Sequence, residues 1–323
     1  MNRLSAKVLL TSAAAKLPLI RALEQTLGQV AGNRLWLGDS DGAAVSSKIG
    51  LDFWIMPKLI QENASDLIQG CLDRGINFIF PTRDGELEFW AKNSAEFSRH
   101  GIFVLVSELE AVRLCLDKLS FSAFGKLHDL PIIESSLVLE DVEGESIVVK
   151  ERFGAGSKSI GLNLDRNQAL NFAKRLQDPI FQPYFSGREI SVDAWANAGG
   201  VIVGLVLRSR DLVREGESQV TTTFRHLGIE EQVKQFLTAI SKSHRLFGPM
   251  VLQGLIQSDE RLEIIELNAR FGGASTASLQ VGLDSILWSL QAAGFGLPSK
   301  PFARSDFEVR QVRHSADLYV KMP

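Results

Sequence analysis

The sequence predicts an α/β protein, and three observations indicate this class. Apolar strand-like runs alternate with helical patterns across residues 1–112, which is typical of an open, mainly parallel sheet covered by helices. A β-branched strand at 146–150 leads into a Gly-rich turn. Two apolar runs flank a polar tip at 258–261, which is the pattern of a β-hairpin. The 323 residues suffice for two or three compact lobes.

The expected elements of the first region follow from apolar periodicity and from turn residues. We expect strands at 7–12, 33–38, 53–56, 77–81 and 102–106, and helices at 17–27, 64–74 and 87–97. In open parallel sheets ligands collect beyond the carboxyl ends of the strands, where the loops at 39–41 and 82–86 lie. No G-x-G-x-x-G follows the first strand, so a dinucleotide site is disfavoured.

The composition is that of an ordinary globular protein, with 45% hydrophobic and 23% charged residues. The formal charge of −3 gives no reason to expect nucleic acid or a membrane surface as a partner. Cys71 and Cys115 are the only cysteines, which favours a reducing compartment, and we expect the cytoplasm. No apolar run is long enough to span a membrane, and Lys16 and Pro18 interrupt the signal-like start.

The late hairpin, residues 250–278, carries polar residues at alternate positions. Glu266, Asn268 and Arg270 are two apart, so the pleat of a strand places them on one face. Regular pairing of Gln257 with Leu262 across the polar tip would set residue 253 opposite residue 266. The alternative is an exposed polar face on an edge hairpin.

This face has a defined chemistry. The oxygens of Gln253, Glu266 and Asn268 suit a hard cation such as Mg²⁺, which takes its other ligands from phosphate and water. The planar guanidinium of Arg270 suits a phosphate or a carboxylate. The two glycines that follow, Gly272 and Gly273, permit a close approach of the backbone to an anion.

The segment after the strand at 146–150 contains three glycines and two serines within residues 154–161. Such a loop exposes backbone N–H groups to phosphate oxygens. It lacks the spacing of a Walker A loop, and taken alone a Gly-rich hairpin is usually only a turn.

In these stretches the chain resembles the ATP-grasp superfamily, especially its carbamoyl-phosphate-synthetase large-subunit-like branch. IIELNARFGGAS (264–275) resembles the metal-binding strand, the strand lysine with its Gly-rich loop resembles the small lobe, and FQPYFSGRE (181–189) resembles the segment between the lobes. The resemblance implies a pre-ATP-grasp domain at 1–112, a small lobe at 113–186 and a large lobe with the metal site at 187–323.

The resemblance also implies roles for individual residues. Glu266 and Asn268 bind Mg²⁺ or Mn²⁺, with Gln253 as a weaker third ligand because many relatives carry an acid there. Arg270 meets the transferred phosphate, and Lys150 assists it in catalysis. The implied ATP contacts are Lys118, Lys150, Gly154, Gly156, Ser157, Lys158, Gln182, Tyr184, Phe185 and Glu189. Gln182 departs from the usual acid, and Pro183 removes an N–H donor from the adenine segment.

The substrate contacts are the least specific part of the pattern. Arg83 and Asp84 follow a strand end, where ordinary turn and N-cap residues are an equal alternative. Arg208 and Arg214 belong to a charged stretch, 208–217, which we expect to form a loop. Mixed charges there suit a carboxylate or a zwitterion, and a solvated loop is the alternative.

The implied activity is an ATP-dependent ligase. A small carboxylate is activated as an acylphosphate and attacked by an amine, with release of ADP and phosphate. A single module of this length does not suggest complete carbamoyl-phosphate synthesis. The alternatives are an ATP-binding regulatory subunit without turnover and an ATP-grasp phosphotransferase. The expected partners are a carboxylate and an amine, and the protein is expected to form a homodimer, with no nucleic acid and no membrane.

Overall fold

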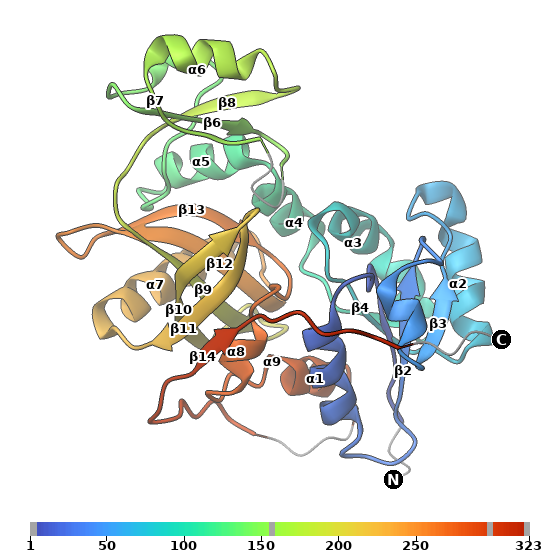
Figure 1. The fold of residues 1–323 in the computed structure, drawn as a ribbon. Helices are drawn as coiled ribbons and strands as arrows, with labels where there is room; N and C mark the ends of the chain where they lie inside the picture. Colours follow the sequence, from blue (N-terminus) through green and yellow to red (C-terminus); the bar gives the residue numbers. More distant parts are fainter. Residues whose placement is uncertain (1–4, 155–158, 296–299, 320–323) are drawn as a thin grey trace.

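The computed structural model describes residues 5–154, 159–295 and 300–319, and these form three sheets (Figure 1). The first sheet is five-stranded with the order β3-β2-β1-β4-β5, and all its pairs are parallel. We call this part the N-terminal domain. Its elements are β1 (Lys7–Leu10), α1 (Leu17–Leu27), β2 (Arg34–Asp39), β3 (Asp52–Ile55), α2 (Ala64–Asp73), β4 (Phe78–Phe80), α3 (Asp84–Arg99) and β5 (Phe103–Val104).

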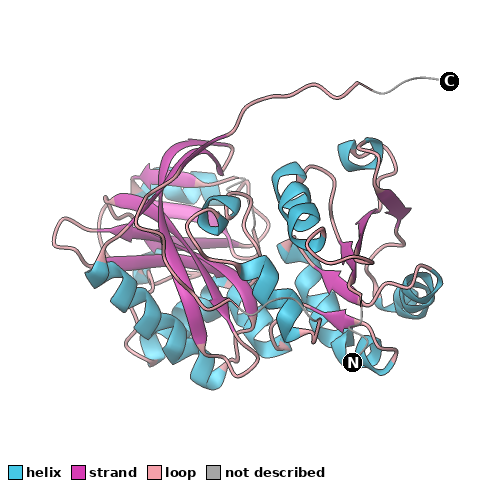
Figure 2. Ribbon diagram, turned by 90° about the horizontal axis from the view of Figure 1, so that it is seen from below, coloured by secondary structure: helices cyan, strands magenta, loops and turns pink. Residues whose placement is uncertain are grey.

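Alternation along each strand explains why helices cover both faces of this sheet (Figure 2). Val8 and Leu10 point into a core with α1, whereas Leu9 points into the opposite core with α2 and α3. Both sets are fully buried. The expected open parallel sheet is therefore confirmed.

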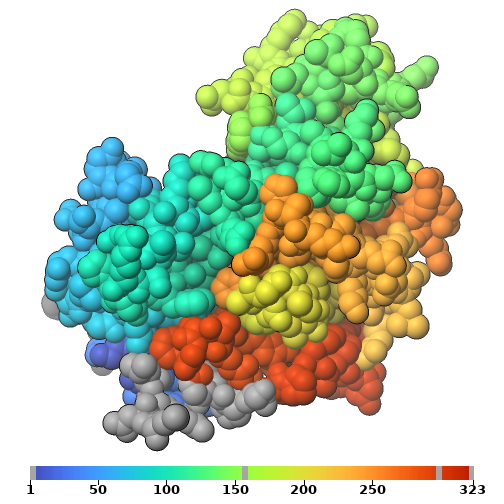
Figure 3. All heavy atoms as spheres, turned by 180° about the vertical axis from the view of Figure 1, so that it is seen from behind, coloured from blue at the N-terminus to red at the C-terminus, as the bar shows by residue number. Residues whose placement is uncertain are grey.

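The second sheet has three strands in the order β7-β6-β8, covered by α6. We call it the small lobe, and it stands above the rest of the molecule in Figures 1 and 3. Its elements are β6 (Ile147–Glu151), β7 (Gly161–Leu164), α6 (Arg166–Ala173) and β8 (Pro179–Pro183). The lobe has its own small apolar core, centred on Ile147, Val149 and Phe181.

The third sheet, which we call the large lobe, is six-stranded and antiparallel, with the order β13-β12-β9-β10-β11-β14. Its elements are β9 (Arg188–Ala196), β10 (Ile202–Arg214), β11 (Glu217–Phe224), α7 (Leu227–Ser243), β12 (Gly248–Ile256), β13 (Leu262–Asn268), α8 (Thr276–Leu279), α9 (Ser285–Ala292) and β14 (Arg310–Val312). Two further helices, α4 (Leu109–Leu116) and α5 (Lys118–Leu127), pack into its core beside α7. The division of the chain near residues 112 and 186 remains our proposal.

The N-terminal domain and the large lobe share one apolar core. Phe271 and Phe295 of the large lobe pack on the first sheet, where their rings lie 6.2 Å from Phe80 and 6.0 Å from Phe78, centroid to centroid. Ile286 from α9 is buried in the same cluster. This shared packing fixes the carboxyl ends of β1 and β4 opposite the end of β13.

Two expectations about local structure were wrong. The charged stretch 208–217 is not a loop, because β10 continues to Arg214 and turns tightly through Glu215 and Gly216 into β11. Helix α3 begins at Asp84, three residues earlier than expected, because Glu86 accepts the backbone N–H groups of Thr82 and Arg83 and so closes the first turn.

The late hairpin contains a bulge that the expected regular register lacks. Ile256, not Gln257, pairs with Leu262, and the pairing slips by one residue so that Gln253 still lies opposite Glu266. The extra residue is Ile265. A bulge re-aims the side chains on either side of it, and here it buries Ile264 while residue 266 faces a cavity. Ile265 lines that cavity too.

Among the described residues no helix has the length and apolar character that crossing a membrane requires.

A buried ion pair joins three elements of the large lobe. Arg208 on β10 donates two hydrogen bonds to Asp193 on β9, at 2.6 and 3.0 Å, and both side chains are 3% exposed. Ser275 and Ser278, beside and within α8, also donate to this carboxylate. The Arg208 guanidinium also donates to the Thr221 hydroxyl. Because its donors are used within the protein, this is the environment of a structural residue and not of a residue free to bind substrate.

Arg208→Met should therefore destabilise the protein by about 3–5 kcal/mol, since it leaves a buried carboxylate without its counter-charge. Thermal unfolding with and without denaturant measures the change. Arg214→Met is the matched control, because Arg214 is exposed at the end of the same strand and should shift stability by less than about 0.5 kcal/mol. Equal melting curves for the two variants would contradict the assignment.

Candidate functional site

A cavity of about 800 Å³ lies where the N-terminal domain, the small lobe and the large lobe meet. Most of the residues singled out in the sequence line it. These are Arg83, Asp84, Lys118, Lys150, Gly154, Gln182, Tyr184, Phe185, Glu189, Arg208, Gln253, Glu266, Asn268 and Arg270. Gly156, Ser157 and Lys158 lie outside the described residues, and Arg214 does not line the cavity.

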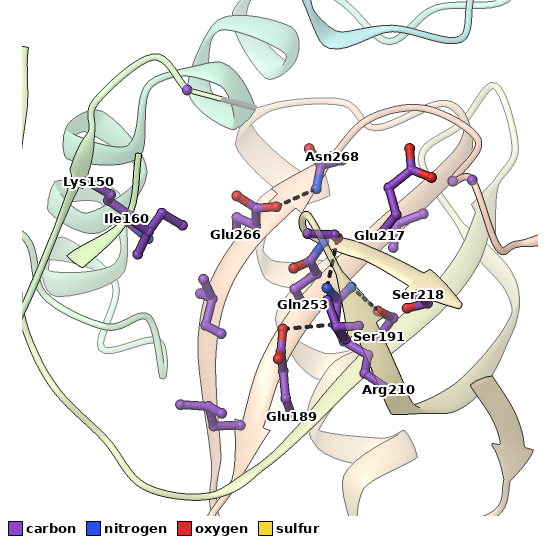
Figure 4. A pocket seen from close by; sticks show the side chains of 18 of the residues that line it. Lys150, Ile160, Glu189, Ser191, Arg210, Glu217, Ser218, Gln253, Glu266 and Asn268 are labelled. Carbon is purple, nitrogen blue, oxygen red and sulfur yellow. Dashed lines mark hydrogen bonds and ion pairs between the residues drawn. The ribbon is translucent and has the colours of Figure 1, made fainter. Parts of the chain in front are cut away.

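The late hairpin supplies the oxygen-rich edge of this cavity. Gln253 and Glu266 are cross-strand neighbours, and the Asn268 amide donates to a Glu266 carboxylate oxygen at 3.0 Å. Figure 4 shows the three side chains together on one face of β12 and β13. All three are half-buried, so their oxygens are held in place and remain accessible.

This donor set fits a magnesium–nucleotide complex better than a bare ion. It offers one carboxylate and two amide oxygens, and the described residues contain no group of three or more His, Cys, Asp or Glu side chains that would hold a metal alone. Mg²⁺ is commonly bound by one or two carboxylates together with phosphate oxygens and water. The residues present therefore fit the ion when phosphate supplies the missing ligands.

Two lysines face the oxygen-rich edge from the small-lobe side of the cavity. Lys150 is only 4% exposed, and its side chain forms no hydrogen bond or ion pair within the described part of the chain. Burial lowers the pKa of Lys150 to about 8, while the charge of Glu266 raises it and that of Lys118 lowers it. A desolvated ammonium without a partner favours an anionic ligand such as a phosphate.

Lys118 is held at the start of the Gly-rich loop. Its ammonium donates to the carbonyl of Gly154 at 2.6 Å. The preceding Asp117 caps α5 and receives two hydrogen bonds from Arg152, at 2.7 and 2.5 Å. Burial alone would raise the pKa of Asp117, but the hydrogen bonds from Arg152 and Ser120 lower it to about 2. This carboxylate thus ties α5 to the end of β6.

The segment between the lobes lines the same cavity. The Gln182 amide donates to the Ile133 carbonyl at 3.2 Å and to Ser135 at 2.7 Å, so its N–H groups are used within the protein. Tyr184 and Phe185 follow β8 along the wall. Glu189 is half-buried at the start of β9 and pairs with Arg210 at 2.9 Å; Figure 4 shows both side chains.

Arg270 meets a partner that the sequence did not suggest. Its guanidinium donates two hydrogen bonds to Asp84, at 2.7 and 2.5 Å, across the boundary between the large lobe and the N-terminal domain. A third goes to the carbonyl of Phe271 at 3.3 Å. The bidentate contact fixes the plane of the guanidinium, so Asp84 positions Arg270.

Sequence reasoning missed three further cations of the wall: Lys16, Arg210 and Arg313. Arg210 shares a strand face with Arg208, two residues along, so the period-two pattern could have found it once 202–214 was assigned as strand. Lys16 and Arg313 come from distant parts of the chain, and their local sequence carries no signal.

Residues 175–315 match the family described as ATP-grasp in the biosynthetic pathway with Ter operon. The biotin carboxylase domain of 2-oxoglutarate carboxylase from Hydrogenobacter thermophilus, solved with MgADP and bicarbonate, has a TM-score of 0.73 at 16% identity, covering 95% of this chain and 74% of that chain. The L-amino acid ligase from Bacillus licheniformis has a TM-score of 0.68 at 15% identity, with 90% and 75% covered.

The N5-carboxyaminoimidazole synthetase from Staphylococcus aureus, solved with ADP, has a TM-score of 0.69 at 17% identity, covering 92% of this chain and 80% of that chain. No curated protein sequence matches the chain. The chain thus has the ATP-grasp fold, as the resemblance in the sequence implied. The carbamoyl-phosphate-synthetase-like branch remains a prediction.

Lys150→Ala should weaken nucleotide binding by about 1.5–3 kcal/mol, as expected for a hydrogen bond to a charged group. Affinity of the wild type should be full below pH 8 and fall as the pH rises above about 8, because phosphate binds the protonated lysine and raises its pKa. Lys150→Arg should remove that decline. Calorimetric titration with MgADP across this pH range measures the affinity of the wild type, of Lys150→Ala and of Lys150→Arg.

The control for this experiment is Lys174→Ala, since Lys174 is exposed on the small lobe and its ammonium donates to the Asn171 side chain. Unchanged MgADP affinity in Lys150→Ala would remove this lysine from the nucleotide site.

The single carboxylate of the oxygen-rich edge leads to a prediction about metal binding. Mg²⁺ alone should give no saturable heat at millimolar concentrations, whereas MgADP should bind. Gln253→Glu adds a second carboxylate and should lower the Mg²⁺ concentration needed for nucleotide binding roughly tenfold. Gln25→Glu, at an exposed position on α1, controls for net charge. An unaltered Mg²⁺ requirement in Gln253→Glu would place the metal elsewhere.

Proposed function

We propose that this protein is an ATP-dependent ligase that activates a small carboxylate and joins it to an amine, releasing ADP and phosphate. The observation that carries the proposal is the convergence of Lys118, Lys150 and Arg270 on the edge formed by Glu266 and Asn268 in one cavity. The fold similarity to an L-amino acid ligase is consistent with this class of reaction.

The proposed chemistry brings two negatively charged groups together. A carboxylate oxygen attacks the γ-phosphorus of ATP, the bond to the bridging oxygen breaks, and ADP leaves. The amine then attacks the acyl carbon, loses a proton and displaces phosphate. Mg²⁺, held by Glu266, Asn268 and Gln253, would neutralise phosphate charge when bound. The chain's own cations hold the reacting groups and stabilise the charge that develops between them.

Each residue then has a defined task. Lys150 and Lys118 bind nucleotide phosphates from the small-lobe side, beside Gly154 at the start of the Gly-rich loop. Arg270, oriented by Asp84, contacts the phosphoryl group during transfer. The nucleoside occupies the wall of Gln182, Tyr184, Phe185 and Glu189. The proposal requires no protein nucleophile. We also propose a cytoplasmic protein that forms a homodimer.

The test is a phosphate-release assay with MgATP and a panel of amino acids and small carboxylates, singly and in pairs, with hydroxylamine to trap the acylphosphate as a hydroxamate. Phosphate release should require a carboxylate. Glu266→Gln should lower kcat by at least about a hundredfold, because the edge loses its only carboxylate, while the melting temperature stays near that of the wild type.

Other outcomes point to other functions. Nucleotide binding without any carboxylate-dependent release would favour a regulatory subunit, and phosphate retained on the product would favour a phosphotransferase. Near-normal turnover of Glu266→Gln would contradict the metal assignment.

A further inference from the structure

The wall that the N-terminal domain contributes to the cavity is built from two adjacent strand ends. β1 and β4 pair in parallel, and the segments after them are joined because the Thr82 hydroxyl donates to the Thr11 carbonyl at 2.7 Å. Lys16 follows β1, and Arg83 follows β4. Both side chains therefore reach the cavity at the carboxyl edge of the sheet, where ligands of open α/β sheets bind.

Neither of these cations has a counter-charge in the part of the chain that the structure describes. Among the described residues, the ammonium of Lys16 and the guanidinium of Arg83 take part in no hydrogen bond and no ion pair. Lys16 is half-buried and Arg83 is exposed. Burial lowers the pKa of Lys16, and the charge of Arg270 lowers it further, against the opposing charges of Glu217, Asp84 and Glu86. A partly desolvated lysine without a partner is costly unless an anion binds it.

The neighbouring charges do not supply that anion, because each already has its own partners. Asp84 holds Arg270 in a bidentate pair, and Glu217 receives a hydrogen bond from Arg313. The Glu86 carboxylate accepts from two backbone N–H groups, at 2.8 and 2.9 Å, and from the Trp90 indole at 3.1 Å.

The lysines that line the cavity fall into two groups on either side of the oxygen-rich edge. Lys118 and Lys150 belong to the small-lobe side, where Glu266 is the acidic group that acts on Lys150. Lys16 lies on the side of the N-terminal domain, where the charges that act on it are those of Arg270, Glu217, Asp84 and Glu86. Under the proposed function, Lys118 and Lys150 bind the nucleotide phosphates, and Arg270 lies between these two lysines and Lys16. Lys16 therefore remains available to bind the acceptor.

We propose that Lys16, together with Arg83 from the adjacent strand end, binds a second acidic group of the acceptor, so that the acid activated at Arg270 carries at least two negative charges. This inference rests on the proposed ligase function and adds the substrate class to it. The second group is a carboxylate or a phosphate, because either accepts charge-assisted hydrogen bonds from an ammonium and a guanidinium. Lys16 is then a specificity-determining residue of the acceptor site.

The experiment compares acids that differ only in that second group. Glutamate is paired with glutamine, succinate with succinamate, and phosphoserine with serine, and phosphate release is measured with MgATP and hydroxylamine as the nucleophile. For the wild type, kcat/KM of the acidic member of at least one pair should exceed that of its neutral partner roughly tenfold or more. A preference within the glutamate or succinate pair would identify the second group as a carboxylate, and a preference for phosphoserine over serine would identify it as a phosphate.

Lys16→Met keeps the length of the side chain and removes its charge. It should raise KM for the preferred acidic member roughly tenfold and leave KM for the neutral partner within about twofold. Lys16→Arg should restore the preference. Lys58→Met, at an exposed position in the same domain, should match the wild type. A purely structural role for Lys16 would lower activity on both members of a pair equally, and that result would overturn the inference.

A binding experiment separates this inference from the proposed function. The same acids are titrated calorimetrically into MgADP-loaded protein. Tighter binding of an acidic member that depends on Lys16, without any phosphate release, would leave the inference standing and refute the ligase. If no acid binds or reacts better than its neutral partner in the wild type, the inference is wrong.

Discussion

The packing of the N-terminal domain against the large lobe is the constraint on which the cavity depends. Aromatic side chains from both, Phe78 and Phe80 on one side and Phe271 and Phe295 on the other, share one core. A close-packed apolar core does not allow the two parts that share it to slide past each other. It therefore sets the strand ends that carry Asp84 against the end of β13, where the bidentate contact to Arg270 forms. Without that partner, a carboxylate that is 7% exposed would be strongly destabilising.

The small lobe is attached in a different way. Its core of Ile147, Val149 and Phe181 is separate from that of the large lobe, and the connection runs through α5 and the segment after it, where Ile132 forms an isolated bridge with Ile264. Lobes joined by limited contacts move relative to each other more readily than lobes with a common core. Lys150 lies on β6 of this lobe, so the position of the lobe sets the distance of this lysine from Glu266.

Charge pairing divides the cavity into regions with different chemistry. Arg208 with Asp193 and Arg270 with Asp84 are closed pairs that hold strands and domains in place. Lys150 and Lys16 remain without partners in the described part of the chain, at opposite sides of an edge that carries one carboxylate. The protein thus keeps its structural ion pairs satisfied and leaves unpaired positive charge where negatively charged ligands would bind.

The sequence alone determined the α/β class, the alternating strands and helices of the first region, and the face shared by Glu266, Asn268 and Arg270, because these follow from periodicities of two and 3.6 residues within single elements. It also gave the pairing of Gln253 with Glu266, although by a regular register that a bulge replaces. The tertiary structure alone decided that Asp84 meets Arg270 across 186 residues, that Arg208 is buried in an ion pair, and that Lys16 and Arg313 reach the same cavity. Such contacts depend on how separate sheets pack, and no local pattern of residues encodes the orientation of one sheet against another.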